Sequence, residues 1–331
     1  MAKIVLGLGT SHGPMLSTPP EEWGQRAIFD RQIRHHYRGE TWSFAELVEL
    51  RRDQHVAREI TLERWRERHS ACRQALARLA AAFEAAQPDI VIILGNDHME
   101  MFEPAAVPAF SIFWGEALVN NPYSAEHMAR LAPGQEIALP GHIPPGGARY
   151  PCASVLGRHL IEAAIAAGFD VASMKELPRD ETPHAYGFVY RQIMSDRALP
   201  CVPVAVNTYY PPNQPSVARC YAFGKALAHA IESWDSDLRV ALVASGGLSH
   251  FVIDEELDAA FLDSLRRGDI DKLGGFSEAH FQSGTSEIKN WLPLAGAMAE
   301  LGFELGHIDY VPCYRSPAGT GNAMGFAAWH P

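Results

Sequence analysis

Three histidines end three apolar stretches of the sequence that have the composition of buried strands. His12 follows the apolar run at residues 4–8, His98 ends the stretch 89–98, and His250 ends the stretch 239–250 after a glycine turn. In open α/β sheets, ligand sites collect at the carboxyl ends of the strands. We therefore expect these three histidines to share one site.

The residue types at these positions suit a transition metal. Two neutral imidazoles and one carboxylate, with open positions opposite them, form the facial triad of non-haem Fe(II) oxygenases, although imidazole also suits zinc, copper and nickel. Asp97 is adjacent to His98, and neighbouring residues at a strand end seldom both reach one metal. Glu287, at the expected start of a helix, is a reasonable distant carboxylate, and His184 lies in a further polar turn. The residues alone leave the metal open.

The rest of the chain alternates expected strands with expected helices. Residues 21–86 are charged and rich in alanine and arginine, with Leu76, Leu79 and Phe83 at helical spacing. Residues 133–151 are rich in glycine and proline, which predicts a long loop. Further strands are expected at 109–114, 171–174 and 201–207, and helices at 153–168, 217–233, 255–267 and 286–302.

This alternation predicts an α/β fold: a single domain over residues 1–331, with a central mixed sheet flanked by helices. Residues 21–86 form a helical insertion after the first strand. Most of the insertion is expected to pack on the sheet as a solvated helical layer. Its other possible role is that of a lid over the His12 edge or of a subunit contact.

Composition limits the classes of partner. The chain has 28 basic and 39 acidic residues, a net charge of −11, without a basic cluster. This argues against nucleic acid or an anionic membrane as a partner. Apolar runs stay far below the roughly 20 residues of a membrane span, and the start lacks a signal-peptide pattern. Five scattered cysteines without CxxC spacing predict neither a disulfide framework nor a zinc site, so we expect a cytoplasmic protein.

Five short motifs occur in order over nearly the whole chain. They are Thr10-Ser11-His12, Asn96-Asp97-His98, Gly246-Gly247-Leu248-Ser249-His250, Ser286-Glu287 with Trp291 shortly after, and Asn322-Ala323-Met324-Gly325. In this order they resemble the class III extradiol ring-cleaving dioxygenases of the protocatechuate 4,5-dioxygenase β-subunit (LigB-like) family. A single histidine in a glycine turn is weak evidence, whereas five motifs in register are strong. The main departure is the insertion at 21–86.

The resemblance implies roles for individual residues. By analogy with the family, His12, His98 and Glu287 would bind Fe(II). His250, in the glycine turn, would be the acid–base catalyst. His184, which follows an acidic loop, looks like a second catalytic histidine of the family.

The resemblance also implies a substrate-binding turn. The final motif would contact a substrate carboxylate, which suggests Thr320 and Asn322 as substrate-binding residues. No arginine is evident beside them to pair with that charge, and Arg315 is a candidate with little support from the sequence.

The implied activity is extradiol cleavage by O₂ of a carboxylated catechol or pyrogallol in aromatic catabolism. Protocatechuate, gallate and 3-O-methylgallate are the candidate substrates. Gallate or 3-O-methylgallate is favoured because the chain carries its own insertion where the β subunit depends on a separate small helical subunit. The expected partners are the aromatic substrate, O₂ and a second copy of the chain in a homodimer. The alternatives are a zinc-dependent relative acting on another phenolic compound and a metal-free binding or scaffold protein.

Overall fold

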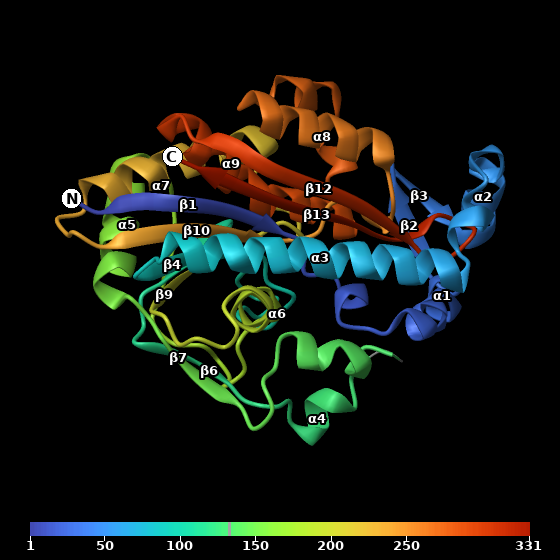
Figure 1. The fold of residues 1–331 in the computed structure, drawn as a ribbon, viewed down its shortest axis with the longest axis horizontal. Coiled ribbons are helices and arrows are strands. Elements are labelled where there is room, and N and C mark those ends of the chain that lie inside the picture. The colour runs from blue at the N-terminus through green and yellow to red at the C-terminus, as the bar shows by residue number, and fades with distance from the viewer. Residues whose placement is uncertain (132–133) are drawn as a thin grey trace.

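A computed structural model describes residues 1–131 and 134–331 (Figure 1). Its centre is a mixed sheet that has nine strands within the described residues, which confirms the predicted α/β architecture. Across the sheet, the strands are β11 (His250–Val252), β13 (Thr320–His330), β1 (Lys3–Thr10), β10 (Arg239–Ser245), β4 (Ile90–Gly95), β9 (Cys201–Val206), β5 (Phe110–Phe113) and β8 (Ala172–Met174), with β12 (Glu304–Tyr314) paired to β13.

The middle of the sheet is parallel. Strands β1, β10, β4 and β9 run in the same direction, so that Thr10 lies opposite Ser245 where β1 and β10 end. Strand β13 pairs antiparallel with β1 and also with β11, where His250 lies opposite Asn322. The register therefore gathers the polar residues that follow these strands at one edge, as the sequence predicts.

Helices cover both faces of the sheet, and the central strands β4 and β9 are accordingly buried along their whole length. In β4, Ile92 belongs to the core cluster that contains Phe223 of α7 (Val217–Ser233), whereas Ile93 belongs to the cluster that contains Leu79 of α3 (Leu62–Ala86). The helices are α1 (Trp23–Asp30), α2 (Phe44–Leu50), α3 (Leu62–Ala86), α4 (Ala125–Met128), α5 (Ser154–Ala166), α6 (His184–Phe188), α7 (Val217–Ser233), α8 (Glu255–Arg267) and α9 (Ile288–Leu301).

The segment 21–86 is not wholly helical. Its long helix α3 lies along the sheet and buries Leu76, Leu79 and Phe83, as expected (Figure 1). Before it, however, β2 (Arg34–Tyr37) and β3 (Glu40–Ser43) form a hairpin. The turn uses two residues with positive φ, Arg38 at 54° and Gly39 at 80°, as tight hairpin turns require. The sequence shows only one of these residues as glycine, and the hairpin was not predicted.

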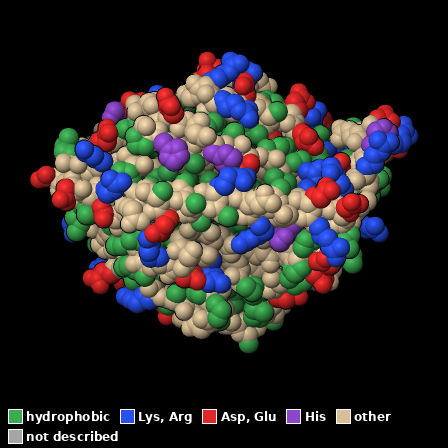
Figure 2. All heavy atoms as spheres, viewed as in Figure 1, with side chains coloured by type: hydrophobic (Ala, Val, Ile, Leu, Met, Phe, Trp, Pro, Cys, Tyr) green, Lys and Arg blue, Asp and Glu red, His purple; other side chains and the backbone are tan. Residues whose placement is uncertain are grey.

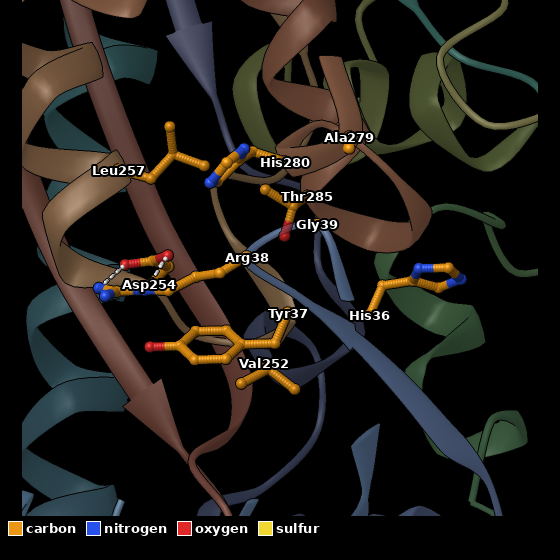
Figure 3. Close-up of a pocket in the computed structure, with 10 residues that line it drawn as sticks. All are labelled: His36, Tyr37, Arg38, Gly39, Val252, Asp254, Leu257, Ala279, His280 and Thr285. Atoms are coloured by element: carbon orange, nitrogen blue, oxygen red, sulfur yellow. Dashed lines mark hydrogen bonds and ion pairs between the residues drawn. The ribbon is translucent and has the colours of Figure 1, made fainter. Parts of the chain in front are cut away.

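The turn of the hairpin is held by an ion pair to the segment between β11 and α8. Figure 3 shows the Arg38 side chain reaching Asp254, which precedes α8. The pair is bidentate, with Nε 3.0 Å from Oδ2 and Nη2 2.9 Å from Oδ1. The hollow beside it has a volume of about 10 Å³, which leaves room for no more than a water molecule.

Two further expectations need adjustment. Of the expected loop at 133–151, Pro133 lies outside the described residues, and the remainder contains a 3-10 helix (Glu136–Gly141) and a strand, β7 (Ala148–Pro151), paired with β6 (Ala117–Asn120). The helix expected from residue 286 begins at Ile288, because Ser283–Glu287 form a 3-10 turn.

The surface carries mixed charges. Figure 2 shows acidic and basic side chains interspersed over the face on which α3 lies. Among the described helices, none combines the length and the apolar character needed to cross a bilayer.

Candidate metal centre and active site

Three distant segments meet at the edge of the sheet. His12 follows β1, His98 follows β4, and Glu287 ends the turn before α9. The Nε2 atom of His12 lies 3.1 Å from Oε2 of Glu287, and Nε2 of His98 lies 3.2 Å from Oε1. The three residues implied as metal ligands are thus brought together, with one imidazole at each oxygen of the carboxylate.

The hydrogen bonds of His12 determine which of its nitrogens is free. Its Nδ1 lies 2.9 Å from the hydroxyl of Ser245, and that hydroxyl donates its proton to the carbonyl of Ala185 at 2.8 Å. Ser245 can therefore only accept from Nδ1–H, which leaves a lone pair on Nε2. Burial also lowers the pKa of His12 despite the neighbouring carboxylate. The ring is neutral and directs its lone pair at Glu287.

Glu287 is held in place by neutral donors. The backbone N–H of Gly247 donates to Oε2 at 2.7 Å, and the amide of Asn96 donates to Oε1 at 3.3 Å. Asn290 in turn donates to the Asn96 oxygen at 2.8 Å. Burial disfavours the charge, but the neighbouring His250 brings the pKa of Glu287 well below its usual value. The carboxylate is ionised and oriented by a second layer of polar groups, an arrangement typical of metal-binding carboxylates.

His250 contacts the same carboxylate from a third side. Its Nδ1 donates to the carbonyl of Leu248 at 2.7 Å, and its Nε2 lies 3.5 Å from Oε1 of Glu287. Burial opposes protonation, yet the charge of Glu287 raises the pKa of His250 above its usual value. Nε2 can therefore take up and release a proton beside Glu287.

His184 begins helix α6 and stands over the other two histidines. Its ring centroid is 4.6 Å from that of His12 and 5.0 Å from that of His98. Glu100 binds both its backbone N–H at 2.9 Å and its Nδ1 at 2.7 Å. Against the effect of burial, this carboxylate raises the pKa of His184 to about 9, while the pKa of Glu100 falls to about 2. The pair is an imidazolium and a carboxylate at neutral pH.

The donor atoms fit a bound metal ion chemically. The buried Nε2 atoms of His12 and His98 make no hydrogen bond, although both point at an ionised carboxylate. Two imidazole nitrogens and one carboxylate are the set that non-haem iron prefers. Within residues 1–131 and 134–331, no group of three or more His, Cys, Asp or Glu side chains already has the spacing of a metal site. The unpartnered nitrogens indicate the site, while the final ligand positions are not preformed.

A cavity of about 1050 Å³ opens beside these residues. His12, His98, His184, His250 and Glu287 all line it. Its volume is at the upper end of the range for small-molecule sites, so it can admit a substituted aromatic ring.

The two residues expected to bind substrate lie differently. Asn322 lines the cavity, and its side-chain oxygen is buried without a hydrogen-bond partner. Thr320 is fully buried, and its hydroxyl donates to Asp30 at 2.6 Å; it is not among the residues lining the cavity. Arg315, the weaker candidate in the sequence, does line the cavity. The structure thus brings Asn322 and Arg315, rather than Thr320, to the cavity surface.

The sequence could not show how Asp97 and Tyr209 lie around His98. Asp97 turns away from the cluster and accepts hydrogen bonds from the backbone of residues 99–102, which shapes the turn after His98. Tyr209 packs against the His98 ring at 5.1 Å between centroids. The Tyr-Tyr-Pro-Pro turn that contains Tyr209 was visible in the sequence, but nothing there indicated what it contacts.

Comparison with known proteins identifies the family. Residues 61–318 match the family model described as the catalytic LigB subunit of aromatic ring-opening dioxygenase. An uncharacterized protein of Escherichia coli K12 has a solved structure that covers 77% of this chain and 91% of its own, at 15% identity and a TM-score of 0.46. An identity and a TM-score this low support no conclusion about the function of this chain.

Curated relatives match about half of the chain. A gallate dioxygenase of Pseudomonas putida KT2440 is 32% identical over 179 residues, 48% of this chain and 48% of that protein. A 2,3-dihydroxyphenylpropionate/2,3-dihydroxicinnamic acid 1,2-dioxygenase of Comamonas testosteroni is 26% identical over 179 residues, 54% of this chain and 48% of that protein. In each case the match spans about half the length of the relative. By the family match over residues 61–318, the chain belongs to the LigB family of catalytic subunits of aromatic ring-opening dioxygenases.

Proposed function

We propose that the protein is an Fe(II)-dependent extradiol dioxygenase that opens the ring of a carboxylated catechol or pyrogallol with O₂. The observation that carries the proposal is the pair of unpartnered Nε2 atoms of His12 and His98 on either side of the buried, ionised Glu287. These three residues would hold the iron. When bound there, ferrous iron supplies a centre at which the diol and O₂ meet and exchange electrons.

The residues around the centre would manage the protons. A diol gives up protons when it binds, and an unprotonated His250 can accept one at Nε2, since its Nδ1 is occupied by the Leu248 carbonyl. The same atom can return the proton to the product. His184, kept protonated by Glu100, places a positive charge and an N–H donor against the same space. A negative charge that develops on the substrate or on oxygen would be stabilised there.

Gallate and 3-O-methylgallate are the favoured substrates, with protocatechuate as the third candidate. The chain has its own segment at 21–86, and Arg26, Phe29 and Asp30 of α1 and Ile33 after it line the cavity. The similarity to a gallate dioxygenase over about half of that protein supports the same choice.

The test is oxygen uptake by protein reconstituted anaerobically with Fe(II). Gallate, 3-O-methylgallate and protocatechuate are offered in parallel, and the products are examined for opening of the ring beside the diol. We expect one O₂ consumed per ring opened, with relative rates that identify the substrate. Bound iron without oxygen uptake on any of these or other diols would contradict the proposal. Turnover of a phenolic compound with zinc and without O₂ would instead establish a zinc-dependent relative.

A further inference from the structure

One wall of the cavity carries two arginines, of which only one is bonded to the carboxylate between them. Arg26 and Asp30 lie on α1, and Arg315 follows β12. The guanidinium of Arg315 donates to Asp30 from Nε at 2.7 Å and from Nη2 at 2.8 Å. Thr320 donates to the same carboxylate at 2.6 Å. Asp30 is therefore committed to Arg315 and Thr320.

Arg26 has no such partner within the described residues. Its Nη1 is buried without a hydrogen bond, and Glu136, the other carboxylate that acts on it, is exposed and accepts no hydrogen bond from it. The remaining arginines that line the cavity are paired, Arg130 with Glu126 and Arg179 with Glu103. Leaving a guanidinium nitrogen buried and unbonded is costly, because the group has five donors and no way to lose its charge easily.

The arginine wall, defined as Arg26 and Arg315, has an excess of positive charge. Burial and the charge of Arg315 together lower the pKa of Arg26 to about 10. Arg315 also acts on the pKa of His250, so it lies within electrostatic range of both the metal centre and Arg26. An anion bound at Arg26 would relieve both the missing hydrogen bonds and the repulsion.

We propose that Arg26, supported by Arg315, binds the carboxylate of the aromatic substrate and so selects acidic diols over neutral ones. The guanidinium offers parallel N–H donors that match the two oxygens of a carboxylate. The proposal rests on the proposed function, since it names the charge class of that substrate. It also gives Thr320 a positioning role, because its hydroxyl helps to hold the Asp30 carboxylate that orients Arg315.

The test compares gallate with its uncharged methyl ester. Binding of each ligand to the metal-free protein is measured by calorimetry, and oxygen uptake with each is measured on the iron-loaded enzyme. Arg26→Met removes the positive charge. Arg26→Lys keeps the charge but lacks the parallel N–H donors of the guanidinium. Arg66→Met is the control. Arg66 pairs with Glu21 just before α1 and does not line the cavity.

We expect Arg26→Met to lower the preference for gallate over the ester roughly tenfold or more, since a hydrogen bond to a charged group is lost. Arg26→Lys should retain part of that preference, and Arg66→Met should retain it fully. An equal loss for both ligands, an unchanged preference, or a wild-type protein that binds gallate no better than the ester would overturn the proposal.

The two proposals can fail separately. A preference for gallate that depends on Arg26, without oxygen uptake, would leave the anion site in place and reject the dioxygenase activity. Oxygen uptake with a preference for gallate that does not depend on Arg26 would support the dioxygenase activity and reject the anion site.

Discussion

The metal centre and the arginine wall border the same cavity but are built in different ways. His12 and His98 follow β1 and β4 in the middle of the sheet, and Glu287 is held by donors that follow β4 and β10, so their positions depend on the core itself. The wall depends on α1 and on the chain after β12, which lie outside the parallel core. Under the two proposals, residues that follow the core strands would hold the metal, whereas α1 and the chain after β12 would decide which ring is accepted.

The largest effect expected from this division is loss of iron when Glu287 is changed. Glu287→Gln keeps the shape of the side chain but removes the charge that attracts the metal between His12 and His98. We expect the variant to retain its fold and to show no iron and no oxygen uptake above background. Iron content after anaerobic reconstitution is the measurement, with circular dichroism as the check on folding.

Glu100→Gln is the matched control for Glu287→Gln. Glu100 is also a cavity-lining carboxylate in contact with a histidine, but it is partly exposed and binds His184. Iron content should be retained in this variant. Full iron occupancy in Glu287→Gln would show that the carboxylate ligand is another residue.

The second effect separates ligands from proton carriers. His250 lies 3.5 Å from Glu287 and could be taken for a third imidazole ligand. If it is the acid–base catalyst, His250→Gln should bind iron with unchanged stoichiometry and lower kcat about 10²–10⁴-fold. Iron analysis and oxygen uptake on one preparation decide this. Loss of iron in parallel with activity would make His250 a ligand and remove it from proton transfer.

The third effect tests whether the centre depends on its polar support. Asn96 contacts Glu287 and is itself held by Asn290. Asn96→Ala should weaken iron binding about 10–100-fold while the three ligands remain in place, as is typical when an orienting residue is lost. Competition with a chelator measures the affinity. An affinity equal to that of the wild type would mean that Gly247 alone orients the carboxylate.

The contrast between the two regions also explains what the sequence could predict. A buried strand followed by a polar turn is visible in the sequence, and parallel strands bring such turns together, which is how His12, His98 and His250 were placed at one edge. Glu287 and His184 needed the family resemblance, because no periodicity links them to that edge. Their convergence with the strand-end histidines is a property of the fold.

The residues of the cavity wall were harder to predict from the sequence than the strand-end histidines. Arg26 was one charged residue in a segment read as helical, and its significance depends on Asp30 being occupied by Arg315, which is 285 residues away in sequence. The positive-φ turn at Arg38, which joins the two strands of the hairpin, was indicated in the sequence by a single glycine. Thr320 was placed beside the substrate from its motif, whereas its hydroxyl faces Asp30. Long-range polar pairing of this kind is decided by the packing of whole elements and has no local pattern.

The change expected to affect activity least, and to appear in stability instead, concerns the support of the His250 turn. Asp258 on α8 is fully buried and accepts hydrogen bonds from the backbone and hydroxyl of Ser249 and from Tyr310, at 2.9, 2.6 and 2.8 Å. Burial nevertheless raises its pKa from 3.8 to about 7. Folding thus favours the protonated carboxyl, and the free energy of unfolding should fall as the pH rises from about 4 to 7, because the unfolded chain releases this proton first.

Asp258→Asn resembles the protonated carboxyl at every pH and should remove this dependence. Relative to the wild type, its free energy of unfolding should therefore increase across the window, by about 1.4 kcal/mol for each unit by which the pKa is raised. Urea unfolding of the metal-free proteins at several pH values measures the difference. Glu256→Gln, on the same helix but exposed, should give a curve parallel to that of the wild type. If Asp258→Asn also runs parallel, the carboxyl is ionised in the folded protein, and the turn before His250 is held by a buried charge rather than by a neutral network.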